Sequence, residues 1–169
     1  QWFQTPLGRI LLSDQRKKIE RVIARMFGFQ QLEMLVSHRI PMGNSSSLGH
    51  KMMVVPQWQP DMPENTLVSV SHELGLLHDS IDLAILHHTL DFAATPHQAL
   101  REASRVVKGS GHLLIVGFNP LSMWGVRKYS SRKKTAPWNG RFISGQRVED
   151  WLNLLDFEIS STHYHFFRP

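Results

Sequence analysis

The chain has 169 residues, 41% of them hydrophobic and 20% charged, which is ordinary for a folded protein and suits one domain. It contains no cysteine, which excludes disulfides, thiolate metal sites and cysteine nucleophiles. No run approaches about 18 apolar residues, the length of a membrane span, and we expect a cytoplasmic protein. The net charge of +5 admits anionic partners.

The first half of the chain predicts one helix followed by short strands. Apolar residues recur at helical spacing after Ser13, which predicts a helix to about Phe27 with Gly28 as its stop. Short apolar runs then predict strands over 32–36, 51–55 and 67–71. Segments rich in turn-forming residues predict loops between them.

The segment 80–120 has the clearest pattern in the chain. A continuous apolar run over 81–86 predicts a strand that is buried on both faces. Thr95 is then expected as the N-cap of a helix with Pro96 at its first position, and Gly109 as the helix stop. Residues 112–118 predict the next strand.

The C-terminal part predicts one more helix and one more strand. Ser144 is expected to cap a helix whose apolar residues recur at helical spacing, and 157–167 alternate loosely as in a strand. Alternation of strands and helices predicts an α/β fold with a Rossmann-like, mainly parallel sheet flanked by helices. Ligands of such sheets bind at the carboxyl ends of the strands.

Several motifs resemble the class I S-adenosylmethionine-dependent methyltransferases of the type 11 kind, in a small bacterial branch. They are His72-Glu73-Leu74, Ser80-Ile81-Asp82-Leu83, Leu100-Arg101-Glu102, Arg105-Val106-Val107-Lys108-Gly109-Ser110-Gly111, Asn119 to Gly125 (NPLSMWG) and Pro137 to Ser144 (PWNGRFIS). The resemblance covers roughly residues 67–160. It implies one methyltransferase-like domain over 1–169, with S-adenosylmethionine as cofactor. The family's last strand has no counterpart before Pro169, so we expect a truncated C-terminal strand.

The resemblance implies a donor site at the carboxyl ends of the first four strands. The residues expected to bind the cofactor are Val36, Ser37, Pro56, Gln57, Glu73, Leu74 and His87. Three usual features of the family are altered. No glycine-rich turn follows the strand over 32–36. Where the family usually has a carboxylate that binds the ribose, the nearest polar side chain in this chain is that of Gln57. Ser71 replaces an acidic residue.

Two residues are candidates for the catalytic step. His88 follows the fourth strand, where a residue near the methyl group would lie, and an imidazole titrates near neutral pH and is suited to act as a base. The alternative for His88 is an ordinary loop histidine. Asn119 is a candidate acceptor contact, or else a turn former before a helix. Methyl transfer depends mainly on alignment of donor and acceptor, so it requires no particular base.

Three functions remain open from the sequence. The first is a methyltransferase that acts on a small-molecule or nucleotide-like acceptor. The second is a methyltransferase-like domain that has lost its cofactor and serves as a binding or scaffold module. The third is nucleic-acid binding through the basic residues Arg127, Lys128, Arg132, Lys133 and Lys134. Neither His87/His88 nor His163/His165 has a carboxylate at a familiar ligand spacing, so we expect no metal site.

Overall fold

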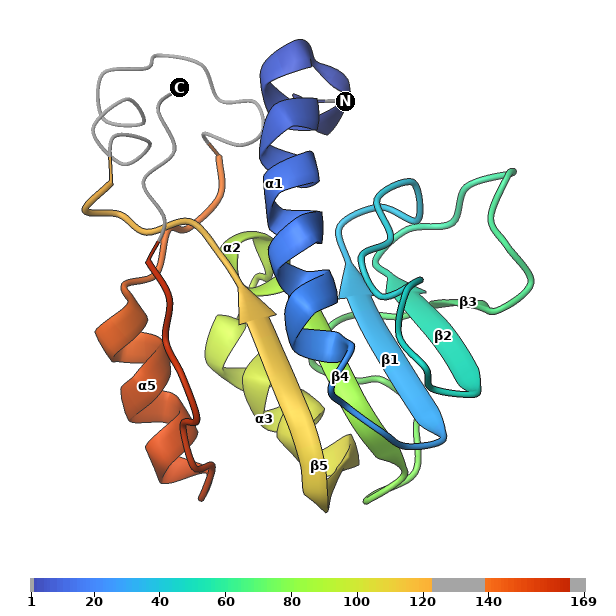
Figure 1. Cartoon of the computed structure of the whole chain (residues 1–169), viewed down its shortest axis with the longest axis vertical. Coiled ribbons are helices and arrows are strands. Elements are labelled where there is room, and N and C mark those ends of the chain that lie inside the picture. The colour runs from blue at the N-terminus through green and yellow to red at the C-terminus, as the bar shows by residue number, and fades with distance from the viewer. Residues whose placement is uncertain (1, 123–138, 165–169) are drawn as a thin grey trace.

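The computed structural model describes residues 2–122 and 139–164, and its strands form one parallel sheet (Figure 1). The sheet has five strands in the order β3-β2-β1-β4-β5. The strands are β1 (Gln30–Leu35), β2 (His50–Val55), β3 (Thr66–Val68), β4 (Ile81–His87) and β5 (Val107–Val116). The helices are η1 (Trp2–Gln4), α1 (Pro6–Ile23), α2 (Thr89–Phe92), α3 (Pro96–Val106) and α5 (Gly145–Leu154). The predicted α/β fold with a parallel sheet is confirmed.

The helices cover the two faces of the sheet, with α1 on one face and α3 on the other (Figure 1). Side chains of β4 alternate between these faces, as they must in a strand. Leu83 and Ile85 pack in the cluster that contains the apolar side of α1. Ala84 and Leu86 pack in the cluster that contains α3 and the apolar residues of α5. β4 is therefore buried on both faces, as its sequence predicts.

The first helix begins earlier than predicted. α1 starts at Pro6, and the Thr5 side chain accepts a hydrogen bond from the N–H of Gly8 at 3.2 Å. Proline is favourable at this position because the first N–H groups of a helix have no partner within the helix. Ser13 therefore lies inside α1, and α1 ends at Ile23, so the predicted start and end are both wrong.

The junction of α3 and β5 also differs from the prediction. α3 begins at Pro96, as expected, although the Thr95 side chain makes no capping hydrogen bond. The helix ends at Val106, and β5 begins at the next residue instead of after a glycine stop. Ile81 pairs with Val107 and Leu83 with His112, so Gly109 lies in a bulge of β5. The glycine marks a strand irregularity here, which is its other common role.

The C-terminal part follows the prediction for the helix only. Ser144 caps α5 by accepting a hydrogen bond from the N–H of Arg147, as expected. Residues 157–164 form no strand, so the predicted strand over 157–167 is wrong for its described part. The basic cluster at 127–134 lies outside the described residues, as do residues 123–125 and 137–138 of the two family-like motifs at 119–125 and 137–144. None of the described helices is long and apolar enough to cross a membrane.

Candidate functional site

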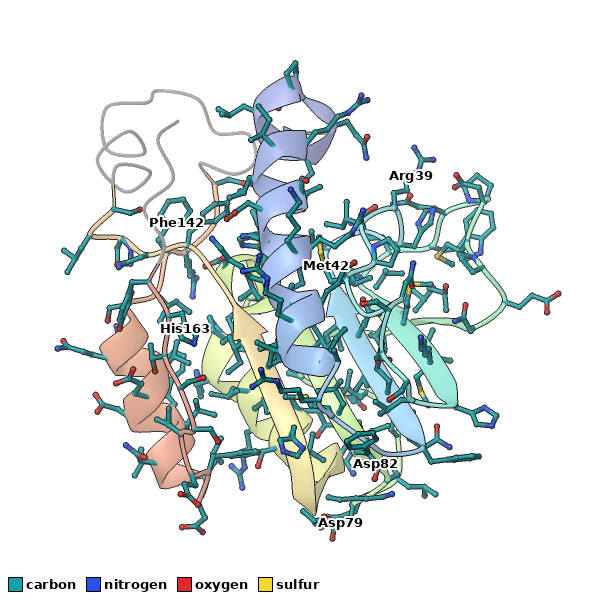
Figure 2. All side chains as sticks on the ribbon, in the orientation of Figure 1. Arg39, Met42, Asp79, Asp82, Phe142 and His163 are labelled. Atoms are coloured by element: carbon teal, nitrogen blue, oxygen red, sulfur yellow. The ribbon has the colours of Figure 1, made fainter. Side chains whose placement is uncertain are left out.

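The carboxyl ends of β1, β2 and β4 meet at one edge of the sheet because the strands are parallel. β1 lies between β2 and β4, so the order of the strands reverses at β1 and β4. Parallel sheets bind ligands outside such a switch point. Figure 2 shows Arg39 beyond this carboxyl edge, whereas Asp79 and Asp82 lie at the opposite edge.

A hollow of about 60 Å³ lies at this switch point. It is lined by Met34, Leu35, Val36, Val54, Val55, Pro56, Ser69, Ser71, Thr89, Phe92 and Ala93. The Thr89 hydroxyl donates to the carbonyl of Met34 at 2.6 Å, whereas the Ser71 hydroxyl has no partner among the described residues. Small-molecule pockets usually exceed about 300 Å³, so this hollow would hold only part of such a ligand.

A buried carboxylate of β1 fixes the loop that follows this strand. Glu33 is 2% exposed and accepts hydrogen bonds from the N–H groups of Met42 and Gly43, both at 2.9 Å. Gln31 donates a third at 3.0 Å. Burial raises the pKa of Glu33, although the hydrogen bonds and Lys51 oppose this effect. Figure 2 shows Met42 between β1 and α1, so the loop after β1 lies on the sheet where a crossover helix would otherwise pack.

Gln31 completes this buried network. Its Nε2 donates to the carbonyl of Gly43 at 3.1 Å, and its Oε1 accepts from the hydroxyl of Ser46. Lys51 of β2 donates to the carbonyls of Asn44 and Ser46 at 2.7 and 2.9 Å. The loop backbone is thus bound to β1 and β2 through its N–H and C=O groups.

A charged contact joins the loops that follow β1 and β2. The guanidinium of Arg39 donates to Asp61 at 2.8 Å, and His38 Nε2 lies 3.4 Å from the same carboxylate. The hydrogen bond from Arg39 lowers the pKa of Asp61. These two loops begin at Val36 and Pro56, which both line the hollow.

His87 and His88 lie in the core and do not line the hollow. Both side chains are 0% exposed. Burial lowers the pKa of His88 to about 3, and burial together with His88 and Arg16 lowers the pKa of His87 well below its ordinary value. Their partners are Gln15 of α1 and Asp91 of α2. The spacing His-x-x-Asp is the one feature of the sequence that could have indicated the contact between His88 and Asp91.

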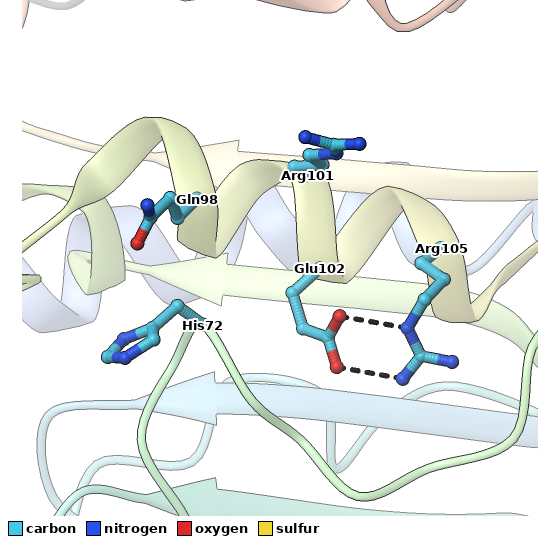
Figure 3. A pocket seen from close by; sticks show the side chains of 5 residues that line it. All are labelled: His72, Gln98, Arg101, Glu102 and Arg105. Atoms are coloured by element: carbon cyan, nitrogen blue, oxygen red, sulfur yellow. Dashed lines mark hydrogen bonds and ion pairs between the residues drawn. The ribbon is translucent and has the colours of Figure 1, made fainter.

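A second hollow, of about 390 Å³, lies on the outer side of α3 (Figure 3). His72, Gln98, Arg101, Glu102 and Arg105 line it. The dashed lines in Figure 3 mark the contacts of Glu102 with Arg105, at 2.7 and 2.8 Å. Glu102 also accepts from the N–H of Leu74, and Arg105 donates to the carbonyl of Leu76. These contacts fasten the loop before β4 to α3.

Two comparisons of the sequence with known proteins find matches to this chain. Residues 51–115 match the family model described as "Methyltransferase domain". "Uncharacterized protein YafS" of Escherichia coli (strain K12) is 33% identical over 167 residues, covering 94% of this chain and 65% of that protein. The chain therefore spans slightly less than two thirds of this relative's length.

Solved methyltransferases share the fold. A Thermotoga maritima S-adenosylmethionine-dependent methyltransferase, described as a possible histamine N-methyltransferase, matches with a TM-score of 0.64 and 22% identity, over 89% of this chain and 78% of that one. Phosphoethanolamine N-methyltransferase 2 of Haemonchus contortus, in complex with S-adenosyl-L-methionine, matches with a TM-score of 0.59 and 16% identity, over 85% and 36%. The chain shares the fold of these class I methyltransferases. The Rossmann-like architecture expected from the sequence is thereby confirmed.

The expected cofactor residues of this methyltransferase-fold chain are only partly brought together. Val36 and Pro56 line the hollow at the switch point, and Ser37 and Gln57 follow them directly in the chain. Glu73 and Leu74 are placed differently. Glu73 is exposed, and its N–H donates to the carbonyl of Val70. Leu74 is a buried member of the core that contains α3.

Asn119 lies just beyond the carboxyl end of β5. Its Oδ1 accepts from the N–H of Leu121 at 3.0 Å, and its carbonyl accepts from the N–H of Ser122. This is the local turn that asparagine commonly forms. Its Nδ2 has no partner among the described residues.

Proposed function

We propose that this chain transfers a methyl group from S-adenosylmethionine to an acceptor. The hollow at the switch point, within a sheet of the class I methyltransferase fold, carries the proposal. Val36 and Pro56, two residues expected to contact the donor from the sequence, line this hollow. Polar groups at its rim suit a ligand with an apolar ring and hydroxyl groups.

The residues present fit the adenosine part of the donor. Met34, Val55 and Phe92 offer an apolar surface to a planar ring, and the unpartnered Ser71 hydroxyl would bind a ring or ribose atom. The amide of Gln57, exposed beside Pro56, would bind the ribose hydroxyls in place of a carboxylate. Ser37 would lie on the side of the methionine part. When bound, the donor supplies an electrophilic methyl group on its sulfonium.

The acceptor would approach from the side of β5, and we assign its contact to Asn119. The free Nδ2 of Asn119 can donate to an oxygen or nitrogen of a small-molecule or nucleotide-like acceptor. The protein's task is then to hold donor and acceptor in line. The buried His88 contributes indirectly, by fixing the fold around α2.

Thermal unfolding with and without S-adenosylmethionine tests the proposal. A ligand at 100 times its dissociation constant stabilises a protein by about 2.7 kcal/mol. Ser71→Trp should abolish the shift by filling the hollow. The matched control is His72→Trp, because His72 is the exposed neighbour and lines the other hollow. No shift of the unmodified chain at millimolar ligand would contradict the proposal and favour a scaffold role.

A further inference from the structure

We infer that Gln15 of α1 is a positioning residue that links His88 to His87, sets the tautomer of His87 opposite to that of His88, and thereby fixes α2, one wall of the hollow. Gln15 is the one described side chain that hydrogen-bonds to both imidazoles. The assignment follows from which atoms can donate. The ligand-binding part of the inference rests on the proposed function, and the tautomer part does not.

The His88 tautomer follows from Asp91. His88 Nδ1 lies 2.7 Å from Asp91 Oδ2, which also accepts from the N–H of Phe118 at 3.0 Å. A carboxylate only accepts, so the Nδ1 of His88 carries the proton. The buried imidazole is neutral, and its Nε2 is therefore an acceptor.

The His87 tautomer follows from Gln15. The acceptor Nε2 of His88 lies 3.0 Å from Gln15 Nε2, which donates to it. Gln15 Oε1 then accepts from His87 Nε2 at 2.9 Å, so His87 carries its proton on Nε2. Its Nδ1 remains buried without a partner among the described residues. In this arrangement the 3.3 Å approach of Gln15 Oε1 to His88 Nε2 brings two acceptors together and is no hydrogen bond, so the shorter contacts set the order of protons from Asp91 to His87.

This chain of hydrogen bonds ends at the wall of the hollow. His88 is the N-cap of α2 and has a φ of 56°, a left-handed conformation that is unfavourable for most residues. Side-chain bonds to Gln15 and Asp91, with ring contacts to Phe3 and Phe118, hold it there. The next residue, Thr89, lines the hollow, as do Phe92 and Ala93. α1, which contributes no residue to the hollow, would therefore control its shape.

Nitrogen-15 NMR of the two imidazoles tests the tautomers in the unmodified chain. The expected result at neutral pH is a proton on Nδ1 of His88 and on Nε2 of His87. The same tautomer for both rings, or a charged ring, would overturn the inference. This measurement needs no variant and no ligand.

Variants of Gln15 test the effect on the hollow. Gln15→Leu should release the tautomer of His87, leave the tautomer of His88 fixed by Asp91, and raise the dissociation constant for S-adenosylmethionine by about tenfold. Lys17→Leu, on an exposed position of α1, should change neither the tautomers nor the dissociation constant. If Gln15→Leu fails to fold, Gln15→Glu is the second variant, and its readout is the charge state of His88 in the nitrogen-15 NMR spectrum. Its carboxylate would accept from both Nε2 atoms and face Asp91 across His88, and Arg16 acts electrostatically on the neighbouring His87, so His88 should become charged near neutral pH. A shifted His87 tautomer with an unchanged dissociation constant would overturn the inference that Gln15 controls the shape of the hollow. If the unmodified chain does not bind S-adenosylmethionine, the proposed function is contradicted but the tautomer assignment is not.

Discussion

The carboxylate of Glu33 accepts the backbone N–H of Gly43 at 2.9 Å, so a strand and the loop that follows it are joined inside the core. Gly43 packs directly against this carboxylate and the amide of Gln31. The loop from 36 to 49 therefore has a fixed path although it contains no helix. This path leads away from Val36, which lines the hollow at the end of β1.

Gly43→Ala should destabilise the fold. A Cβ at this position would lie 2.1 Å from Gln31 Nε2 and 2.5 Å from Glu33 Oε1, so the buried network would have to move. Overpacking of this kind costs about 1–3 kcal/mol of unfolding free energy, measurable by urea titration. Gly109→Ala is the control, because its Cβ would meet nothing within 4 Å. Equal stability of the two variants would show that the loop adapts freely.

Glu33→Gln should change how stability depends on pH. Burial raises the pKa of Glu33 above its ordinary 4.5, so the folded chain binds more protons than the unfolded chain above that pH. The ionisation of Glu33 therefore makes the free energy of unfolding fall as pH rises from about 4.5 through the pKa of the folded chain, above which it levels off. Glutamine cannot ionise, so the decline should disappear.

The same substitution should also lower stability at every pH. The new Nε2 would face the N–H of Met42 or Gly43, and a buried donor without an acceptor costs about 1–3 kcal/mol. Urea unfolding at several pH values separates the two effects, because only the slope reports the titration. Parallel pH profiles for the variant and the unmodified chain would contradict the raised pKa.

The sheet was predictable from the sequence because its signals are local. The apolar runs that became β1, β2 and β4 lie between turn residues, and the residues that follow them, Val36 and Pro56, mark the edge that forms the hollow. The helix start at Pro6 was also local, since Thr5-Pro6 repeats the pattern of Thr95-Pro96. The helical spacing of apolar residues after Ser13 indicates a later start, because Ser13 is itself a favourable capping residue.

The buried polar partners were not predictable, because distant parts of the chain supply them. Glu33 is an isolated acid in an apolar strand, but nothing local indicates that it binds the N–H of Met42, nine residues later. From the sequence, His88 is a candidate base or an ordinary loop histidine, and neither interpretation places it in the core. It is buried against Gln15, 73 residues earlier, and against the rings of Phe3 and Phe118. The sequence alone therefore could not show that His88 is buried, because its burial depends on how α1 packs against the end of β4.

Thr5→Ala should cost more than Ser13→Ala. The Thr5 hydroxyl caps α1, and removal of such a cap costs about 1 kcal/mol of unfolding free energy. Ser13 is exposed inside α1, where alanine has the higher helix propensity, so Ser13→Ala should be neutral or slightly stabilising. Urea titrations of both variants give the comparison. A larger loss for Ser13→Ala would place the start of the helix at the later residue.

Asp82→Asn should remove an acid-sensitive link at the amino ends of the strands. Asp82 of β4 pairs with Lys108 in the bulge of β5 at 2.7 Å and accepts the N–H groups of Phe29 and Gln30, both at 2.9 Å. The hydrogen bond from Lys108, followed by the one from Gln30, lowers the pKa of Asp82 to about 2 from an ordinary 3.8. The unfolded chain therefore binds the extra proton between these values, and stability is gained above about pH 3.8 and lost as pH falls toward 2.

The Asp82→Asn variant should thus be less stable by about 1–3 kcal/mol near pH 7, and close to the unmodified chain near pH 2. Asp79→Asn is the control, because among the described residues the Asp79 carboxylate pairs only with the exposed His78, and asparagine tolerates its positive φ of 50°. It should change stability by less than about 1 kcal/mol. Thermal unfolding between pH 2 and 7 measures all three proteins. A constant difference between Asp82→Asn and the unmodified chain across that range would mean that the lost hydrogen bonds matter and the charge on Asp82 does not.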